Sequence, residues 1–383
     1  MICGPSLGLF LPRDATESVL RIECIMDIFG KNFRVSVFGE SHGDGIGVVI
    51  DGVPAGLVLS EDDFSIDLSR RKSGAKGTTP RKEDDKPQIL SGIMAGHTTG
   101  APIAVLFRNS NTRSSDYSMF REIPRPGHAD FVAGVKWHDF NDPRGGGHFS
   151  GRVTLALVAA GTVAKKILHS SVAAGRIASS GLPLPDSDRL FDISAVITEI
   201  GGVPREEALH GKEGETDPSV LWSSVLDEAA SRGDSLGGIV ECRVENIPVG
   251  LGEPFFDSVE SLVSHLAFSI PGVRGVEFGD GFRAARMRGS EHNDPLVSPS
   301  GSTARNGSGG VNGGITNGNP LVFRVAFKPT SSIRAVQHTW NFTSGKIDSL
   351  EVPGRHDVCF TLRTPVIVES AAAIALADLL LTL

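Results

Sequence analysis

The sequence has few cysteines and no surplus of positive charge, and each shortage excludes a class of protein. Its four cysteines, Cys3, Cys24, Cys242 and Cys359, show no CxxC spacing. They indicate neither a disulfide framework nor a zinc signature, which favours a reducing cytoplasm. The formal net charge of −8 argues against nonspecific binding to nucleic acid, because such binding needs a surplus of cations.

Long apolar runs are also missing. The most apolar segment, 366–383, contains Glu369 and Asp378, so it predicts a buried helix rather than a membrane span. The first 25 residues lack a basic region before "LGLFL" and therefore resemble neither a secretory signal nor a transit peptide. We expect residues 1–25 to be a poorly ordered extension and residues 26–383 to form a single domain. The expected protein is cytoplasmic, with no membrane partner.

Several catalytic signatures are absent as well. No HxH, HxxxH or HExxH pair occurs, so we predict no metal site. A serine hydrolase is poorly supported, because GxSxG at a strand–helix elbow is missing. The glycine-rich stretch "RGGGHFSGR" has neither Walker A nor GxGxxG spacing, which weakens nucleoside-triphosphate and Rossmann interpretations.

The 46 glycines and 22 prolines indicate many turns rather than a helical bundle. Strands and helices mix without strict βαβ alternation, which favours an α+β fold. We interpret residues 170–235 as helices and loops, and the Gly/Asn/Ser-rich stretch "SPSGSTARNGSGGVNGGITNGNP" as too polar to form core. The clearest expected elements are a strand–loop–strand unit at 33–57, a helix capped by Ser60, a strand pair within 88–110, a helix over 153–168 and a last helix entered through Pro365.

Two segments could bind an anion. "SRRKSGAKGTTPRK" carries six basic residues and no acid, which fits either a solvated loop or an anion site. "RGGGHFSGR" leads directly into the helix predicted at 153–168, and free backbone N–H groups at a helix N-terminus attract anions.

Three of the eleven histidines lie in tight polar clusters. His42 is in "GESHG", His128 in "RPGHAD" and His356 in "GRHD". A neutral imidazole can give or take a proton near pH 7, and adjacent arginines can hold an anionic substrate. The residues alone thus predict an enzyme that acts on a phosphorylated or polycarboxylated small molecule, and they leave its reaction open.

The order of the motifs resembles that of the chorismate synthases. "FGESHG", "DGVPAGL", "TTPRKE", "RPGHAD", "VAAGTVAKK", "GLGEP", "GVEFGDGF", "KPTSSI" and "GRHD" follow one another as in that family, from about Met26 to the C-terminus. The resemblance implies the last step of the shikimate pathway, a carbon–oxygen lyase reaction. In it, 5-enolpyruvylshikimate-3-phosphate loses phosphate by anti-1,4 elimination to give chorismate. It also implies a β-α-β sandwich of antiparallel sheets around a helical layer, and a homotetramer.

The resemblance further implies that the enzyme depends on reduced FMN without net redox change, with NADPH as an indirect reductant. His42 would be the general acid at the leaving phosphate, His128 would stabilise the reduced flavin, and Asp357 would assist proton relay. Arg71 and Lys76 match basic positions that the family assigns to NADP. The implied flavin contacts are His148, Phe149, Ser150, Pro271, Gly272, Gly313, Lys328, Pro329, Thr330, Ser331, Ser332 and Arg355.

The sequence departs from the family pattern at three of these positions. His148 and Phe149 stand where the family usually has arginine and serine, and Lys76 where it usually has arginine. Because lysine and histidine lack the planar guanidinium fork, we predict weaker flavin or substrate affinity rather than loss of function. Two alternatives stay open: a homologue that binds flavin or substrate without turnover, and an NADPH-dependent flavin reductase.

Overall fold

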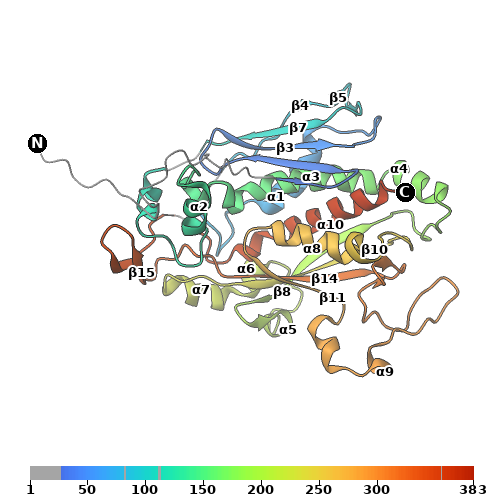
Figure 1. Cartoon of the computed structure of the whole chain (residues 1–383). Coiled ribbons are helices and arrows are strands. Elements are labelled where there is room, and N and C mark those ends of the chain that lie inside the picture. Colours follow the sequence, from blue (N-terminus) through green and yellow to red (C-terminus); the bar gives the residue numbers. More distant parts are fainter. Residues whose placement is uncertain (1–26, 82, 111–113, 355) are drawn as a thin grey trace, which may run out of the picture.

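Two antiparallel five-stranded sheets enclose a layer of helices (Figure 1). The structure, a computed structural model, describes residues 27–81, 83–110, 114–354 and 356–383. The predicted extension of residues 1–25 lies outside the described residues. The predicted arrangement of antiparallel sheets around helices is confirmed. The assignment of residues 26–383 to one domain stays a prediction.

The first sheet has the strand order β1-β2-β3-β7-β4, with every neighbouring pair antiparallel. Successive side chains of its central strands point to opposite faces of the sheet. In β3, Ile46, Val48 and Ile50 therefore point into the core and are fully buried. The predicted strand–loop–strand unit corresponds to β2 and β3. The strands of this sheet are β1 (Ile28–Phe29), β2 (Arg34–Gly39), β3 (Gly45–Asp51), β4 (Gln88–Ser91) and β7 (Ile103–Arg108), and a small hairpin adds β5 (Ile93–Met94) and β6 (His97–Thr98).

The second sheet has the order β11-β14-β10-β8-β9 and is also antiparallel. It corrects one prediction, because the nine-residue strand β8 falls inside the segment interpreted as helices and loops. Only Ile197 and Ile200 of β8 are fully buried, so its apolar alternation is weak, and pairing with β10 defines the strand. The strands are β8 (Asp192–Ile200), β9 (Val203–Pro204), β10 (Gly238–Glu245), β11 (Val273–Phe278) and β14 (Leu321–Phe327).

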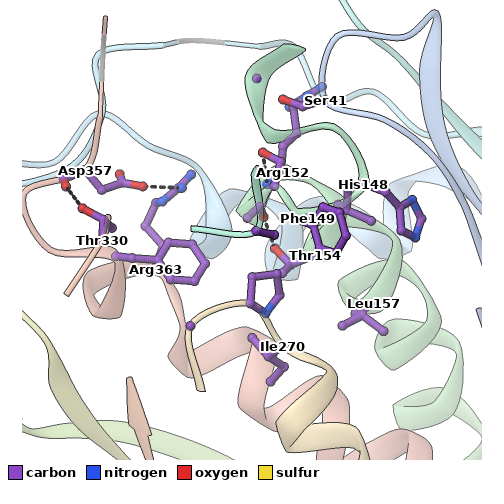
Figure 2. Close-up of a pocket in the computed structure, with 18 of the residues that line it drawn as sticks. Ser41, His148, Phe149, Arg152, Thr154, Leu157, Ile270, Thr330, Asp357 and Arg363 are labelled. Atoms are coloured by element: carbon purple, nitrogen blue, oxygen red, sulfur yellow. Dashed lines mark hydrogen bonds and ion pairs between the residues drawn. The ribbon is translucent and has the colours of Figure 1, made fainter. Parts of the chain in front are cut away.

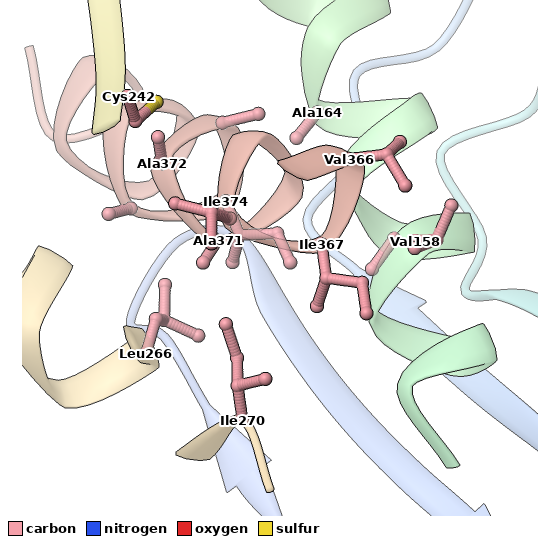
Figure 3. Packing of buried hydrophobic residues seen from close by; sticks show 14 of the residues in the cluster. Val158, Ala164, Cys242, Leu266, Ile270, Val366, Ile367, Ala371, Ala372 and Ile374 are labelled. Carbon is pink, nitrogen blue, oxygen red and sulfur yellow. The ribbon is translucent and has the colours of Figure 1, made fainter. Parts of the chain in front are cut away.

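The helices α3 (Thr154–Leu168) and α10 (Pro365–Leu380) form the centre of the molecule. They pack against each other; α3 also lies against β3, and α10 against β8. Because sheets or helices surround α10, it is buried on all sides, as predicted, and Pro365 occupies its first turn. Figure 3 shows its small residues Ala371 and Ala372 in this packing.

The contact between α3 and α10 depends on a glycine. A Cβ atom added to Gly161 of α3 would lie 2.3 Å from the Cβ atom of Ser370 on α10. The two helix backbones therefore approach more closely than any larger residue at position 161 would allow.

Two buried acids fix α10 to its surroundings. The carboxylate of Glu369 accepts hydrogen bonds from Arg70 at 2.6 and 2.7 Å and from Lys165 at 3.0 Å. One oxygen of Asp378 accepts the backbone N–H groups of Lys31, Asn32 and Phe33, at 2.9, 2.6 and 2.8 Å. The helix thus connects the helical layer to the segment that precedes β2.

Shorter elements surround this framework. The helix predicted to begin at Ser60 is a 3₁₀ turn, Glu61–Phe64, followed by α1 (Ser65–Arg71), with a capping box between Ser60 and Asp63. The remaining helices are α2 (Asp130–Trp137), α4 (Ser171–Ser179), α5 (Arg205–Ala208), α6 (Pro218–Leu221), α7 (Ser223–Ser231), α8 (Val259–Ser269) and α9 (Gly289–His292). The remaining 3₁₀ turns are Ser114–Arg121, Arg144–Phe149, Gly151–Val153, Phe255–Asp257, Gly281–Arg286 and Phe360–Arg363, and the outer hairpins are β12 (Val311–Asn312) with β13 (Ile315–Thr316) and β15 (Gln337–Asn341) with β16 (Lys346–Leu350).

The Gly/Asn/Ser-rich stretch contributes more than was predicted. Val311 and Thr316 in the β12–β13 hairpin are 4% and 1% exposed, so the prediction that the stretch forms no core is wrong. The Thr316 hydroxyl is buried because it donates to the carbonyl oxygen of Pro248 at 2.6 Å and accepts from the backbone N–H of Leu251. These bonds satisfy a polar side chain away from water.

In the part of the chain that the structure describes, no single helix is long and apolar enough to cross a membrane. The bent pair 151–168 and 171–179, whose segments meet at 59°, passes the length and composition criteria when taken together. Its first segment includes α3, which is buried between the sheets.

Candidate active site

A cavity of about 1400 Å³ opens where both sheets, α8 and several loops meet (Figure 2). Segments far apart in sequence line it: the loop after β2, the basic loop after α1, the glycine loop before α3 and the segment after β14. Most predicted site residues are brought together there. They are His42, Arg71, His128, His148, Phe149, Ser150, Pro271, Gly272, Lys328, Pro329, Thr330, Ser331, Ser332 and Asp357.

Two predicted residues that the structure describes lie away from this cavity. The ammonium group of Lys76 is exposed and pairs with Asp227 at 2.7 Å. Gly313 lies in the turn between β12 and β13. Neither residue is part of the cavity lining, so their predicted contacts have no support from its geometry. Arg355 lies outside the described residues.

The glycine loop shapes the cavity by lying directly against two histidines. Gly145 and Gly146 adopt φ values of 61° and 80°, which side-chain-bearing residues rarely adopt. A Cβ atom on Gly145 would lie 2.5 Å from Cδ2 of His42, and one on Gly146 would lie 3.4 Å from Nε2 of His128. The glycines are therefore needed both for the turn and for the close approach to the imidazoles.

His42 is a buried histidine whose surroundings favour the neutral ring. Its side chain follows β2, and its ring meets Tyr117 edge-to-face at 5.2 Å between centroids. Burial, together with the nearby charges of Arg81 and Arg144, lowers the pKa of His42 to about 4. Such an imidazole is unprotonated near neutral pH, and an anion that offsets those cationic charges would raise its pKa.

His128 belongs to a chain of hydrogen bonds. Its Nδ1 atom lies 2.6 Å from Oδ1 of Asp130, the first residue of α2. The guanidinium of Arg125 binds both oxygens of the same carboxylate, with Nε and Nη2 each at 2.7 Å. These contacts orient the imidazole at the wall of the cavity.

Both carboxylate oxygens of Asp357 are engaged. Oδ1 accepts the backbone N–H of Thr79 at 2.8 Å, and Oδ2 accepts from Arg363 at 2.8 Å. Figure 2 shows the bond from Arg363 and a further one, in which the Thr330 hydroxyl donates to the backbone oxygen of Asp357. The predicted proton relay would therefore start from an ion-paired carboxylate.

An arginine cluster beneath the cavity was only partly predicted. Asp85 accepts from Arg71 and from Arg152, each at 2.9 Å, and burial lowers the pKa of Arg71 to about 10. Among the described residues, buried nitrogens without a hydrogen-bond partner include Nε of Arg71, Nη2 of Arg152 and Nε of Arg363. Buried donors of this kind are costly unless an acceptor meets them, which suits a phosphate or carboxylate ligand.

The sequence reasoning missed Arg152 and Arg363 as candidate site residues. Arg152 follows the glycine loop and precedes a helix, a position that could have marked it as an anion ligand. Arg363 lies in a mostly apolar stretch, "CFTLRTP", and an arginine there needs a buried partner, here Asp357.

Comparison with known proteins agrees with this geometry. The family model described as chorismate synthase matches residues 33–381. The chain belongs to the chorismate synthase family. The chorismate synthase of Chitinophaga pinensis is 56% identical over 356 residues, covering 93% of this chain and 97% of its own. That of Korarchaeum cryptofilum is 44% identical over 363 residues, covering 92% of this chain and 96% of its own.

A solved chorismate synthase structure shares the fold. It superposes with a TM-score of 0.63 at 28% identity and covers 92% of each chain. As a chorismate synthase family member, the chain is a carbon–oxygen lyase of the shikimate pathway that acts on a small-molecule substrate.

The residue His148, one of the departures from the chorismate synthase pattern, makes a specific contact of its own. Its Nδ1 atom lies 2.8 Å from the carbonyl oxygen of Gly39, and Nε2 lies 3.1 Å from a carboxylate oxygen of Asp27. Phe149 packs against Trp137 at 5.8 Å between ring centroids. The altered loop is therefore held in place at the cavity wall. Figure 2 shows both side chains among the residues that line the cavity.

Proposed function

We propose that this chorismate synthase family member converts 5-enolpyruvylshikimate-3-phosphate into chorismate and phosphate by anti-1,4 elimination, with reduced FMN. The observation that carries the proposal is the convergence of His42, His128 and Asp357 on one cavity. Buried arginine donors beneath the same cavity favour a ligand that carries phosphate and carboxylate groups.

The cavity has the size and chemistry to hold a flavin beside a substrate. Its volume of about 1400 Å³ exceeds the roughly 300–1,000 Å³ typical of a site for one ligand. Leu157 and Ile270 supply apolar wall, and the segment from Lys328 to Ser332 supplies polar groups. In this proposal that segment, Pro271, Gly272 and the loop from His148 to Ser150 hold the FMN.

The proposed roles of the side chains are those that the family resemblance implies. Bound reduced FMN supplies electron density and a basic nitrogen, and NADPH acts only as an indirect reductant. His42 donates a proton to the departing phosphate, which Arg81 and the buried arginines hold. His128 stabilises the reduced flavin, and Asp357 assists the removal of the substrate proton.

An anaerobic assay with the substrate and chemically reduced FMN tests this proposal. We expect chorismate and phosphate to form in equal amounts. Saturable flavin binding without chorismate formation would instead support a homologue that has lost turnover. The altered loop at His148 and Phe149 is the feature that favours this alternative. NADPH oxidation without an added reductase would support a flavin reductase.

Anion binding is expected to raise the proton affinity of His42. In the free protein the pKa of His42 is about 4, below the ordinary histidine value of about 6.5. Its ring is therefore unprotonated at about pH 6. An anion that offsets Arg81 and Arg144 raises this pKa, so binding takes up protons, up to one per site. Sulfate is a suitable probe because it does not titrate in this range.

Calorimetry of sulfate binding at about pH 6, in buffers of different ionisation enthalpy, measures that uptake. The matched control is His42→Asn, which keeps the arginines and removes the titrating ring. Equal proton uptake in the wild type and in His42→Asn would contradict the prediction.

We also propose that the protein is a cytoplasmic homotetramer. Phe255, Phe256 and Phe282 are 87%, 89% and 80% exposed, and apolar side chains of this size on a surface favour subunit contacts. Light scattering of the purified chain tests the stoichiometry, and a monomer at micromolar concentration would refute it.

A further inference from the structure

The contact between His128 and Asp130 specifies where the proton of the imidazole lies. Nδ1 and Oδ1 are 2.6 Å apart, a separation that is attractive only if the nitrogen carries a hydrogen, because two lone pairs at that distance repel. Arg125 Nη2 lies 3.1 Å from the same Nδ1, since both groups donate to the same carboxylate oxygen. A nitrogen that donates to Asp130 cannot also accept from Arg125.

We propose that Asp130 is a positioning residue that holds His128 in its Nδ1–H tautomer, with Nε2 as the atom that meets the cofactor. The inference deepens the proposed function, because it rests on the proposed role of His128 at the flavin. Nε2 faces the glycine loop, where a Cβ atom on Gly146 would lie 3.4 Å away, and His128 lines the cavity.

Asp130 is suited to this task because it is fixed and ionised. Its side chain and that of Arg125 are 6% and 3% exposed, and the backbone N–H of Arg125 also donates to Oδ2 at 3.1 Å. Burial alone would raise the pKa of Asp130, but hydrogen bonds from Arg125 and His128 hold it well below its ordinary value. The carboxylate is therefore a permanent acceptor.

Arg125 is fixed in turn by its own contacts. Nη1 donates to the hydroxyl of Ser332 at 2.9 Å, and the guanidinium carbon lies 4.3 Å from the centre of the Phe120 ring. Ser332 belongs to the segment proposed to contact the flavin, so one network connects the tautomer of His128 to the cofactor wall. A rotation of the imidazole would break its bond to Asp130.

The locked tautomer decides what His128 offers to a ligand. Burial lowers the pKa of His128, although its bond to Asp130 acts in the opposite direction, so the neutral ring is favoured. Neutral His128 then presents a lone pair at Nε2 and accepts a hydrogen bond from a flavin ring N–H. It becomes a donor toward an anionic flavin edge only after Nε2 takes up a proton.

Long-range ¹H–¹⁵N correlation spectra of the protein with ¹⁵N-labelled histidine test the assignment directly. The His128 signal is identified by its loss in His128→Gln, and the spectra need no flavin and no turnover. We expect the Nδ1–H pattern in the wild type. An Nε2–H pattern there would overturn the proposal whether or not any variant folds.

The variant Asp130→Asn is expected to switch His128 to the Nε2–H tautomer. The backbone N–H and Nε of Arg125 both donate to the position of Oδ2, so the amide oxygen of the new asparagine should occupy that position. The amide N–H₂ group then faces Nδ1 of His128. Turnover should fall roughly 10-fold or more, as is usual when the partner that orients a functional histidine is lost. A wild-type tautomer in this variant would also overturn the proposal.

Two further variants make this test specific. Asp130→Glu should restore the Nδ1–H pattern and part of the turnover, because it keeps a carboxylate. Asp280→Asn is the matched control, because Asp280 forms an ion pair with Arg305 and is not part of the cavity lining. This variant should leave the His128 signal unchanged. If flavin binding fails while the tautomer behaves as expected, the proposed function is wrong and the role of Asp130 in fixing the ring stands.

Discussion

Replacing His42 with alanine is expected to lower turnover by about 10²-fold or more, the usual range for a general acid–base group. His42 is the imidazole that lies beside Arg81 and Arg144, where the leaving phosphate is proposed to bind. His42 is not among the residues proposed to hold FMN, so the affinity for reduced FMN should change little. Steady-state chorismate formation and flavin titration measure the two quantities separately.

His97→Ala is the matched control for this variant. The side chain of His97 is exposed and lies outside the cavity lining, and its Nδ1 atom lies 2.9 Å from the backbone oxygen of Ala95. It should keep wild-type turnover. Wild-type turnover in His42→Ala would remove His42 from the mechanism, and an equal loss in both variants would show that the effect is not specific.

Replacing Gly161 with alanine is expected to destabilise the fold by about 1–3 kcal/mol or more, the cost of overpacking a core. The new methyl group would lie 2.3 Å from Cβ and 2.6 Å from Cα of Ser370, so α3 and α10 would have to move apart. Alanine is favoured over glycine in a helix by about 1 kcal/mol, which offsets only part of that cost. The midpoint of urea unfolding at fixed protein concentration measures the difference.

Gly175→Ala provides the same chemical change without the clash. Gly175 lies in α4 and is exposed, and a Cβ atom added there would meet no atom from outside its own helix within 4 Å. This variant should be as stable as the wild type or slightly more stable. If both variants unfold at the same urea concentration, the close approach of the two helices does not limit stability.

Elements with strong local signals could be predicted from the sequence. Pro365 at the start of an apolar run, Ser60 before a group of acids, and the apolar stretch at 153–168 all correspond to observed helix starts or helices. Strand β8 could not be predicted in the same way, because few of its side chains are buried. Its hydrogen bonds come from β10, more than thirty residues later in the chain.

In the candidate site, too, residues with local sequence signals could be predicted and residues paired over long distances in the chain could not. His42 and His128 were found because glycine, proline and arginine surround them locally. The Arg71–Asp85–Arg152 bridge joins positions 14 and 67 residues apart, and no local pattern encodes such a pairing. The basic run also gave no sign that Arg71, the last residue of α1, would turn inward while Lys76 points to solvent.

The central place of α10 has a consequence for biosynthesis. Every strand of both sheets leaves the ribosome before α10 does, because this helix follows all of them in the chain. Until it emerges, one of the two central helices is missing, and α3, β8 and β10 lack the partner that packs against them. The Asp378 carboxylate, which binds the backbone N–H groups of Lys31, Asn32 and Phe33, is missing as well. Nascent chains therefore expose apolar surface on α3 and the second sheet until α10 emerges, which favours protection by chaperones and a fold completed only after translation of that helix.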